Sequence, residues 1–198
     1  MYKVVVIGGG WSGCAAALAA KKAGAEVVLV EKTDLLLGLG NVGGIMRNNG
    51  RFTAAEENIA LGAKELFAVT DKCSRHVNID FPGHKHASLY DVMKVEPEVR
   101  RLLEEKGIEI KIMSRAVDVV MSKDKRAGGK ICEGMIEKIV LAGGEEIEGD
   151  VFVETTGSTG PMGNCLTYGN GCCMCILRCP AFGPRVSISA KAGGSDIM

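Results

Sequence analysis

Three glycines and one acid near the N-terminus have the types and the spacing that bind a dinucleotide. Gly8, Gly10 and Gly13 form a G-x-G-x-x-G motif, and Glu31 ends the next apolar run. Gly8 permits a tight turn, Gly10 lets a pyrophosphate approach the backbone, and Gly13 lets a helix pack closely on a sheet. Glu31 lies where a carboxylate can accept both hydroxyls of an adenosine ribose. Because a carboxylate repels a 2′-phosphate, the motif favours FAD or NAD(H) over NADP(H).

Two further segments belong to the predicted cofactor site. Trp11 and Ser12 complete the glycine turn and begin a helix whose N-terminal N–H groups can bind phosphates. A second glycine-rich stretch follows the acid over residues 32–53. It is either a surface loop or a ligand-binding loop, and we favour the second because ligands bind beyond the carboxyl ends of parallel strands. Its candidate residues are Gly38, Asn41, Gly43 and Gly44.

The cysteines suggest a second kind of chemistry. Five of the eight cysteines lie between Cys165 and Cys179. Cys172, Cys175 and Cys179, followed by proline, have the spacing C-x2-C-x3-C-P of the last three ligands in a bacterial ferredoxin run. The first position of that run is a glycine here, so Cys165 or Cys173 would supply the fourth ligand. An iron–sulfur centre, a redox-active thiol pair, and a structural zinc or inert thiols all remain open.

The predicted elements explain how these residues come together. An apolar strand over 3–7, an alanine-rich helix over 14–23 and a strand over 26–30 form a βαβ unit. We expect a helix over 54–70, an irregular polar stretch over 71–88, a short helical turn over 89–93 and a helix that starts at Pro97 and ends at Gly107. Further strands are predicted over 108–113, 116–121, 135–141 and 148–154, with a polar turn around 123–129. His76, His84 and His86 lie in the irregular stretch, where we expect them to be solvated.

This order predicts an α/β fold, a Rossmann-like parallel sheet with an antiparallel β-meander on one face. Residues 1–160 would form this FAD/NAD(P)-binding domain, and residues 161–198 the cysteine-rich start of an incomplete second, substrate domain. Cys14, Cys73 and Cys132 are scattered along the first domain, and we expect them to be structural.

The motifs resemble the FAD-binding domain of the two-dinucleotide-binding-domain flavoproteins, within the glutathione-reductase-like group. The resemblance covers about residues 1–160, and the 38–44 loop is most similar to the fumarate-reductase and GidA-like branch. It rests on Gly8, Gly10, Gly13, Ala17, Gly24 and Glu31, and on residues 150–157, which resemble the family's turn D-x-h-h-x-A-T-G with Thr155 in place of alanine.

The resemblance implies roles for individual residues. The three glycines of the motif would hold the pyrophosphate of FAD, and the 38–44 loop would approach the pyrophosphate and the ribityl chain. Lys32 would pack near the adenine, and the backbone of Val117 would pair with it. Thr156 and Gly157 would pass close to the nucleotide. The family also has a later Gly-Asp segment that binds the flavin end, and we do not find it before Met198. We therefore expect a truncated chain or a second polypeptide that supplies the remainder.

The net charge and the length of the apolar runs argue against some classes of function. The formal net charge of zero gives no electrostatic case for nucleic acid. No apolar run approaches the length of about 20 residues that a membrane helix needs, and the chain opens directly into a strand, so we expect a cytoplasmic protein. We predict a FAD-dependent oxidoreductase subunit or fragment that acts with a small-molecule substrate or an electron carrier. The alternatives are a non-catalytic nucleotide-binding piece that needs a second chain, or an NAD-dependent dehydrogenase.

Overall fold

A four-stranded parallel sheet forms the centre of the computed structural model, which describes residues 1–42, 57–81, 84–122, 125–127, 130–132, 134–157 and 182–196. The strand order is β11-β1-β2-β5, and all three pairings are parallel. The bounds are β1 (Lys3–Ile7), β2 (Glu26–Val30), β5 (Glu109–Lys111) and β11 (Val151–Glu154). The two central strands, β1 and β2, are continuous apolar runs because both of their faces are buried.

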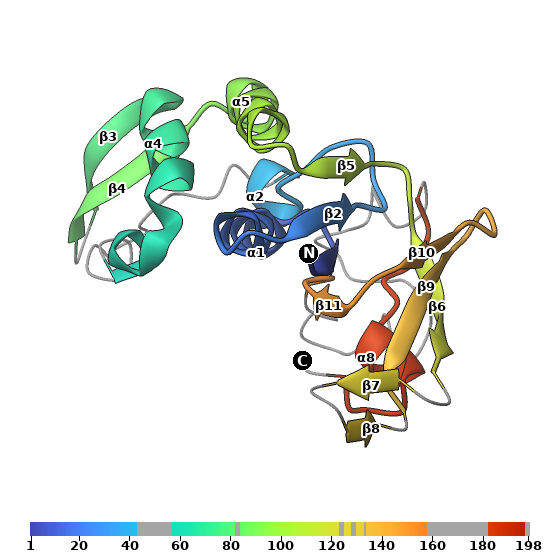
Figure 1. The fold of residues 1–198 in the computed structure, drawn as a ribbon. Coiled ribbons are helices and arrows are strands. Elements are labelled where there is room, and N and C mark those ends of the chain that lie inside the picture. Colours follow the sequence, from blue (N-terminus) through green and yellow to red (C-terminus); the bar gives the residue numbers. More distant parts are fainter. Residues whose placement is uncertain are drawn as a thin grey trace.

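Helices cover one face of this sheet. They are α1 (Trp11–Lys22) and α5 (Val92–Glu105), which lie on the opposite side of the sheet from the antiparallel strands β6, β9 and β10 described next (Figure 1). Alternate residues of a strand point to opposite faces, so one set of strand residues packs against the helices. The cluster on this face includes Val4, Val6, Val27, Leu29, Cys14, Ala17, Val95, Val99 and Leu103.

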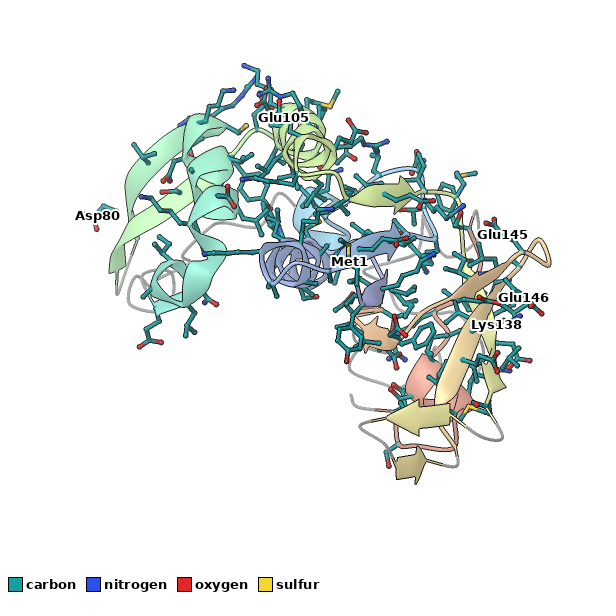
Figure 2. All side chains as sticks on the ribbon, in the orientation of Figure 1. Met1, Asp80, Glu105, Lys138, Glu145 and Glu146 are labelled. Carbon is teal, nitrogen blue, oxygen red and sulfur yellow. The ribbon has the colours of Figure 1, made fainter. Side chains whose placement is uncertain are left out.

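An antiparallel meander covers the other face, as the sequence predicted. It consists of β6 (Ala116–Met121), β9 (Ile136–Leu141) and β10 (Glu146–Glu148), in the order β10-β9-β6. The alternate sheet residues pack against it, in a cluster of Val5, Ile7, Val28, Val30, Ala116, Ile139, Leu141, Ile147 and Ile188. The meander also carries charged side chains, and Figure 2 shows Lys138 near Glu146, with Nζ 3.1 Å from Oε2.

Two polar stretches form β-hairpins. The predictions for them, an irregular segment over 71–88 and a simple turn around 123–129, were wrong. Residues 71–88 contain most of an antiparallel pair, β3 (Ser74–Phe81) and β4 (His84–Tyr90). Its register shifts at three points, and such bulges break the period-two pattern by which a strand is predicted. The expected turn around 123–129 contains the short hairpin of β7 (Lys125–Ala127) and β8 (Lys130–Cys132).

Two helices differ from their predicted bounds. The helix predicted to start at Pro97 begins five residues earlier, because Asp91 caps it by accepting a hydrogen bond from the N–H of Met93 at 3.0 Å. Pro97 therefore lies inside α5. The predicted helix over 54–70 is described from residue 57. It bends at Gly62, which has a φ of 112° and lies within η1 (Ile59–Ala63), just before α4 (Lys64–Lys72).

The β3–β4 hairpin and the meander lie at opposite ends of the molecule, with the parallel sheet between them (Figure 1). Two short helices complete the description, α2 (Leu39–Val42) and α8 (Ile188–Lys191). Since α8 packs on β6 and Ile188 belongs to the core of the first sheet, residues 182–196 are attached to the predicted first domain. The boundary at residue 160 stays a prediction. Within the described ranges, no helix has the length and apolarity needed to cross a lipid bilayer.

Candidate functional site

The first glycine of the motif connects β1 to α1 through a conformation that other residues rarely adopt. Gly8 has a φ of +108°, and its N–H donates to the carbonyl of Val30 at 2.7 Å. A Cβ at this position would lie 2.3 Å from the carbonyl oxygen of Thr155. A side chain is therefore excluded, and the turn between β1 and α1 lies directly against the end of β11.

The other two motif glycines differ in what surrounds them. A Cβ on Gly13 would lie 1.8 Å from the carbonyl oxygen of Gly8, so this glycine permits the close packing of α1 on the sheet. A Cβ on Gly10 would meet nothing within 4 Å in the described part of the chain. Gly10 is the N-cap of α1, and the first helical bond runs from the N–H of Cys14 to the carbonyl of Gly10 at 2.9 Å.

The N-terminus of α1 is thus suited to an anion. Among the described residues, no side chain caps it, and its first turn carries no acidic residue. The N–H groups of the first turn precede the first helical bond and carry the positive end of the helix dipole. Trp11 is half-buried and Ser12 is exposed at this end of the helix. The role of these residues in binding phosphate stays a prediction.

Glu31 is buried, and its carboxylate is held by backbone. Oε2 accepts from the N–H of Gly9 at 2.6 Å, and Oε1 accepts from the N–H of Thr33 at 2.8 Å. The acid therefore joins the first glycine turn to the loop that follows β2. Each carboxylate oxygen can accept more than one hydrogen bond, so these contacts leave capacity for a ribose hydroxyl.

The loop after β2 folds back against the first glycine turn. The N–H of Leu37 donates to the carbonyl of Gly9 at 2.7 Å, and a Cβ on Gly38 would lie 3.6 Å from the Cα of Gly10. The buried Glu96 of α5 holds the same loop by accepting from the N–H of Leu36 at 3.1 Å. The two glycine segments predicted to share a ligand are therefore adjacent, while Gly43 and Gly44 lie outside the described residues.

Tyr90 links the second loop to the start of α1, and sequence reasoning missed it. Its hydroxyl donates to the carbonyl of Gly40 at 2.5 Å and accepts from the indole Nε1 of Trp11 at 3.4 Å. The two rings meet edge to face, with centroids 5.9 Å apart. Burial raises the pKa of the Tyr90 hydroxyl, so it stays protonated as a donor. Because Tyr90 ends a strand that the sequence did not predict, no local pattern pointed to it.

Asn41 presents a buried polar atom near the first glycine turn. The residue is 8% exposed, and its Oδ1 has no hydrogen-bond partner among the residues that the structure describes. An unmade hydrogen bond at a buried acceptor costs about 1–3 kcal/mol. Asn41 lies in α2, the short helix that directly follows Gly38 beside Gly10, where a bound ligand with hydroxyl or N–H groups could satisfy it.

The turn after β11 closes the site from the other side. The hydroxyl of Thr155 donates to the carbonyls of Ile7 and Gly8, at 3.0 and 2.7 Å. Thr156 donates its hydroxyl to Oε1 of Glu154 at 2.8 Å. The replacement of the family's usual alanine by threonine at position 155 thus adds a bond between the end of β11 and the glycine turn.

Two residues predicted to lie near adenine occupy different surroundings. The Nζ of Lys32 donates to the carbonyl of Gly183 at 3.1 Å, which ties it to the segment over 182–196. In β6 the register pairs Ala116 with Leu141 and then Asp118 with Val140, so Val117 is skipped at a bulge. This arrangement is compatible with a Val117 backbone that pairs with a ligand, and its role stays a prediction.

The cysteine cluster, Cys165, Cys172, Cys173, Cys175 and Cys179, lies outside the described residues. Within the described part of the chain, no group of three or more side chains could hold a metal ion. Cys14 and Cys73 are buried, which agrees with a structural role. Burial, and then the charge of Glu31, raise the pKa of the Cys14 thiol to about 12.

Comparisons with known proteins agree with this geometry. The family model described as "Glucose inhibited division protein A" matches residues 3–198. A structure of GidA from Aquifex aeolicus is similar with a TM-score of 0.56 and 21% identity, covering 79% of this chain and 25% of that one. The Diels-Alderase PyrE3 of pyrroindomycin biosynthesis is similar with a TM-score of 0.58 and 16% identity, covering 80% and 33%. No curated protein matches the chain.

Proposed function

Since the chain belongs to the glucose inhibited division protein A family, as its motifs led us to expect, we propose that it binds FAD. The pyrophosphate would lie at Gly10 and the N-terminus of α1, and the adenosine ribose at Glu31. Gly38 and Asn41 would approach from the second loop, and Thr156 from the turn after β11. At this level of identity, the similar structures support the fold alone.

The single observation that carries this proposal is the contrast between the glycines. The backbone fills the space beside Gly8 and Gly13. Beside Gly10, at the N-terminus of α1, no described residue fills the space and no described side chain caps the helix. That combination fits an anion that must approach the backbone closely. The Oδ1 of Asn41 supports it, since this buried acceptor in α2 has no hydrogen-bond partner among the described residues.

We further propose that the chain acts in an oxidoreductase. FAD, when bound, supplies transfer of a hydride or of electrons at its flavin ring. The chain spans a quarter and a third of the two solved structures that it resembles, so the flavin end of the site would be completed by another segment or another polypeptide. A small molecule or an electron carrier would be the second reactant, and the cysteine cluster would be a further redox centre if it binds iron and sulfur.

The experiment is a titration of the purified chain with FAD. The chain contains one tryptophan, Trp11, which lies beside the proposed phosphate site, so its fluorescence should fall as FAD binds. Equilibrium dialysis with flavin absorbance would give the stoichiometry independently, and NADH and NADPH are the matched competitors. Binding of NADH without FAD would overturn the proposal in favour of a dehydrogenase.

Three further outcomes separate the remaining alternatives. A chain that takes up flavin only with a co-purifying polypeptide would show that it is one part of a divided site. A broad visible absorbance that dithionite bleaches, together with iron and sulfide in the purified protein, would identify an iron–sulfur centre. Zinc without sulfide would instead assign the cysteines a structural role.

A further inference from the structure

Glu154 is the most heavily hydrogen-bonded carboxylate around the turn after β11. Its Oε1 accepts from the hydroxyl of Thr156 at 2.8 Å and faces Nη2 of Arg185 at 3.4 Å. Its Oε2 accepts from the N–H and the hydroxyl of Ser189, at 2.7 and 2.5 Å, and from the hydroxyl of Ser187 at 3.4 Å. All five contacts are donors, so the site is built for an ionised acid.

These donors come from both sides of the stretch 158–181. Thr156 precedes that stretch in the sequence, and Arg185 follows it, yet both contact the same carboxylate oxygen. Arg185 is fixed in turn by two bonds of 2.7 Å to the carboxylate of Asp196, and both side chains are more than nine-tenths buried. The two chain segments that flank the stretch therefore meet at Glu154.

The position of Thr156 depends on this carboxylate. The neighbouring Thr155 is tied to β1 and to Gly8, which places the backbone of the 155–157 turn against the glycine turn. The hydrogen bond that Thr156 donates to Glu154 fixes the direction in which the Thr156 hydroxyl points. Without that acceptor, the Thr156 side chain could turn toward the site or away from it.

We propose that Glu154 is a positioning residue for FAD binding because it orients Thr156. Its contacts with the 182–196 segment hold that segment against the carboxyl end of β11 and contribute to the stability of the fold. This inference rests on the proposed function, because Thr156 acts only if the cofactor lies where we place it. Glu154 itself need not contact FAD.

The substitution Glu154→Gln tests the proposal with little change in volume. Glutamine has one acceptor oxygen and one NH2 donor, whereas both carboxylate oxygens face donors. Either orientation of the amide therefore sets its NH2 against Thr156 and Arg185 or against Ser187 and Ser189. We expect FAD binding to weaken about tenfold, as for the loss of hydrogen bonds to a charged group.

Asp196→Asn is the matched control, because it weakens the same Arg185 cluster but leaves the bond from Thr156 to Glu154 intact. The proposal predicts a similar loss of thermal stability in both variants, with FAD affinity within about twofold of wild type in the control. In a Thr156→Val background, Glu154→Gln should have almost no further effect on FAD affinity, since the residue it positions is gone.

The outcomes separate this inference from the proposed function. Wild-type chain that does not bind FAD would overturn both. Wild-type binding with equal losses in Glu154→Gln and Asp196→Asn would overturn the positioning role alone, because the effect would then follow stability. Fully additive effects of Glu154→Gln and Thr156→Val would also overturn it. If Glu154→Gln does not fold, Glu154→Asp, which keeps both acceptor oxygens on a shorter side chain, carries the same comparison.

Discussion

Substitution of Gly10 and Gly13 by alanine should separate the ligand site from the fold. A Cβ on Gly13 would lie 1.8 Å from the Gly8 carbonyl oxygen, so the backbone must move by more than an ångström to relieve the contact. We expect a loss of about 3 kcal/mol, the upper end for overpacking, and a fall in Tm of about 6–12 °C for a chain of this size. The added Cβ would collide with a backbone carbonyl, so repacking of side chains cannot relieve the contact.

Gly10→Ala should behave differently. Its φ of −66° and ψ of −178° are accessible to alanine, and the added Cβ meets no atom within 4 Å in the described residues. Alanine is a poorer N-cap than glycine, but it also reduces the entropy of the unfolded chain. These effects oppose each other, so we expect a stability change within about 1 kcal/mol, or a Tm shift within about 4 °C.

The same Cβ would stand where the pyrophosphate approaches the backbone. A steric overlap that costs about 2 kcal/mol of binding free energy would weaken FAD binding about 30-fold. Thermal melts by circular dichroism and equilibrium dialysis with flavin absorbance measure the two properties independently. Gly143→Ala, in the turn between β9 and β10, controls for glycine replacement, because a Cβ there meets no described atom within 4 Å and the residue does not have a positive φ. A Gly10→Ala variant that is stable and binds FAD like wild type would refute our placement of the phosphates. A Gly13→Ala variant as stable as wild type would refute the packing argument.

Three further predictions concern buried groups. Tyr90→Phe removes the donor to the Gly40 carbonyl and should cost about 1 kcal/mol, seen as a Tm lower by about 2–4 °C and as weaker FAD binding; an unchanged melt would contradict it. Cys14, buried with a pKa of about 12, should resist alkylation at pH 8 in the folded protein, and mass spectrometry would detect early labelling that contradicts this. The Arg185 guanidinium lowers the pKa of Asp196, so this acid stabilises the fold above its ordinary pKa of about 4, and the benefit is lost as pH falls through the lower, folded value. In urea, Asp196→Asn should therefore be less stable than wild type at pH 7, and the difference should shrink at pH 3.

The parts of the fold that the sequence predicted are those fixed by local chemistry. The strand over 3–7 and the strand over 116–121 have the predicted bounds, because apolar runs next to glycine or polar residues leave little choice. The faces of the sheet follow from strand alternation, which sends Val5 to the meander and Val6 to the helices. The turn at Gly8 was predictable because it needs a positive φ at a single position, and the residue at that position is glycine.

The parts that could not be predicted depend on distant partners. Glu96 lies on a helix that the sequence correctly indicated near residue 97, but its partner Leu36 is 60 residues away. Tyr90 reaches Gly40 across 50 residues, and Glu154 meets Ser189 across 35. A buried acid has the same sequence signature as an exposed one, since its burial is decided by donors that only the tertiary fold supplies.

The buried acids also explain how an anion site can form among negative charges. Glu31 and Glu96 each accept a backbone N–H from a turn or loop near the carboxyl ends of the parallel strands, and Glu154 accepts the N–H of Ser189 in α8. Their charge is thus directed at donors that would otherwise be unpaired, rather than at the space beside Gly10. The first turn of α1 carries no acid of its own. The two ends of the proposed site therefore differ in charge, with an acid at the ribose end and N–H groups of the helix N-terminus at the phosphate end. A dinucleotide with a free 2′-hydroxyl matches this arrangement, whereas one with a 2′-phosphate does not.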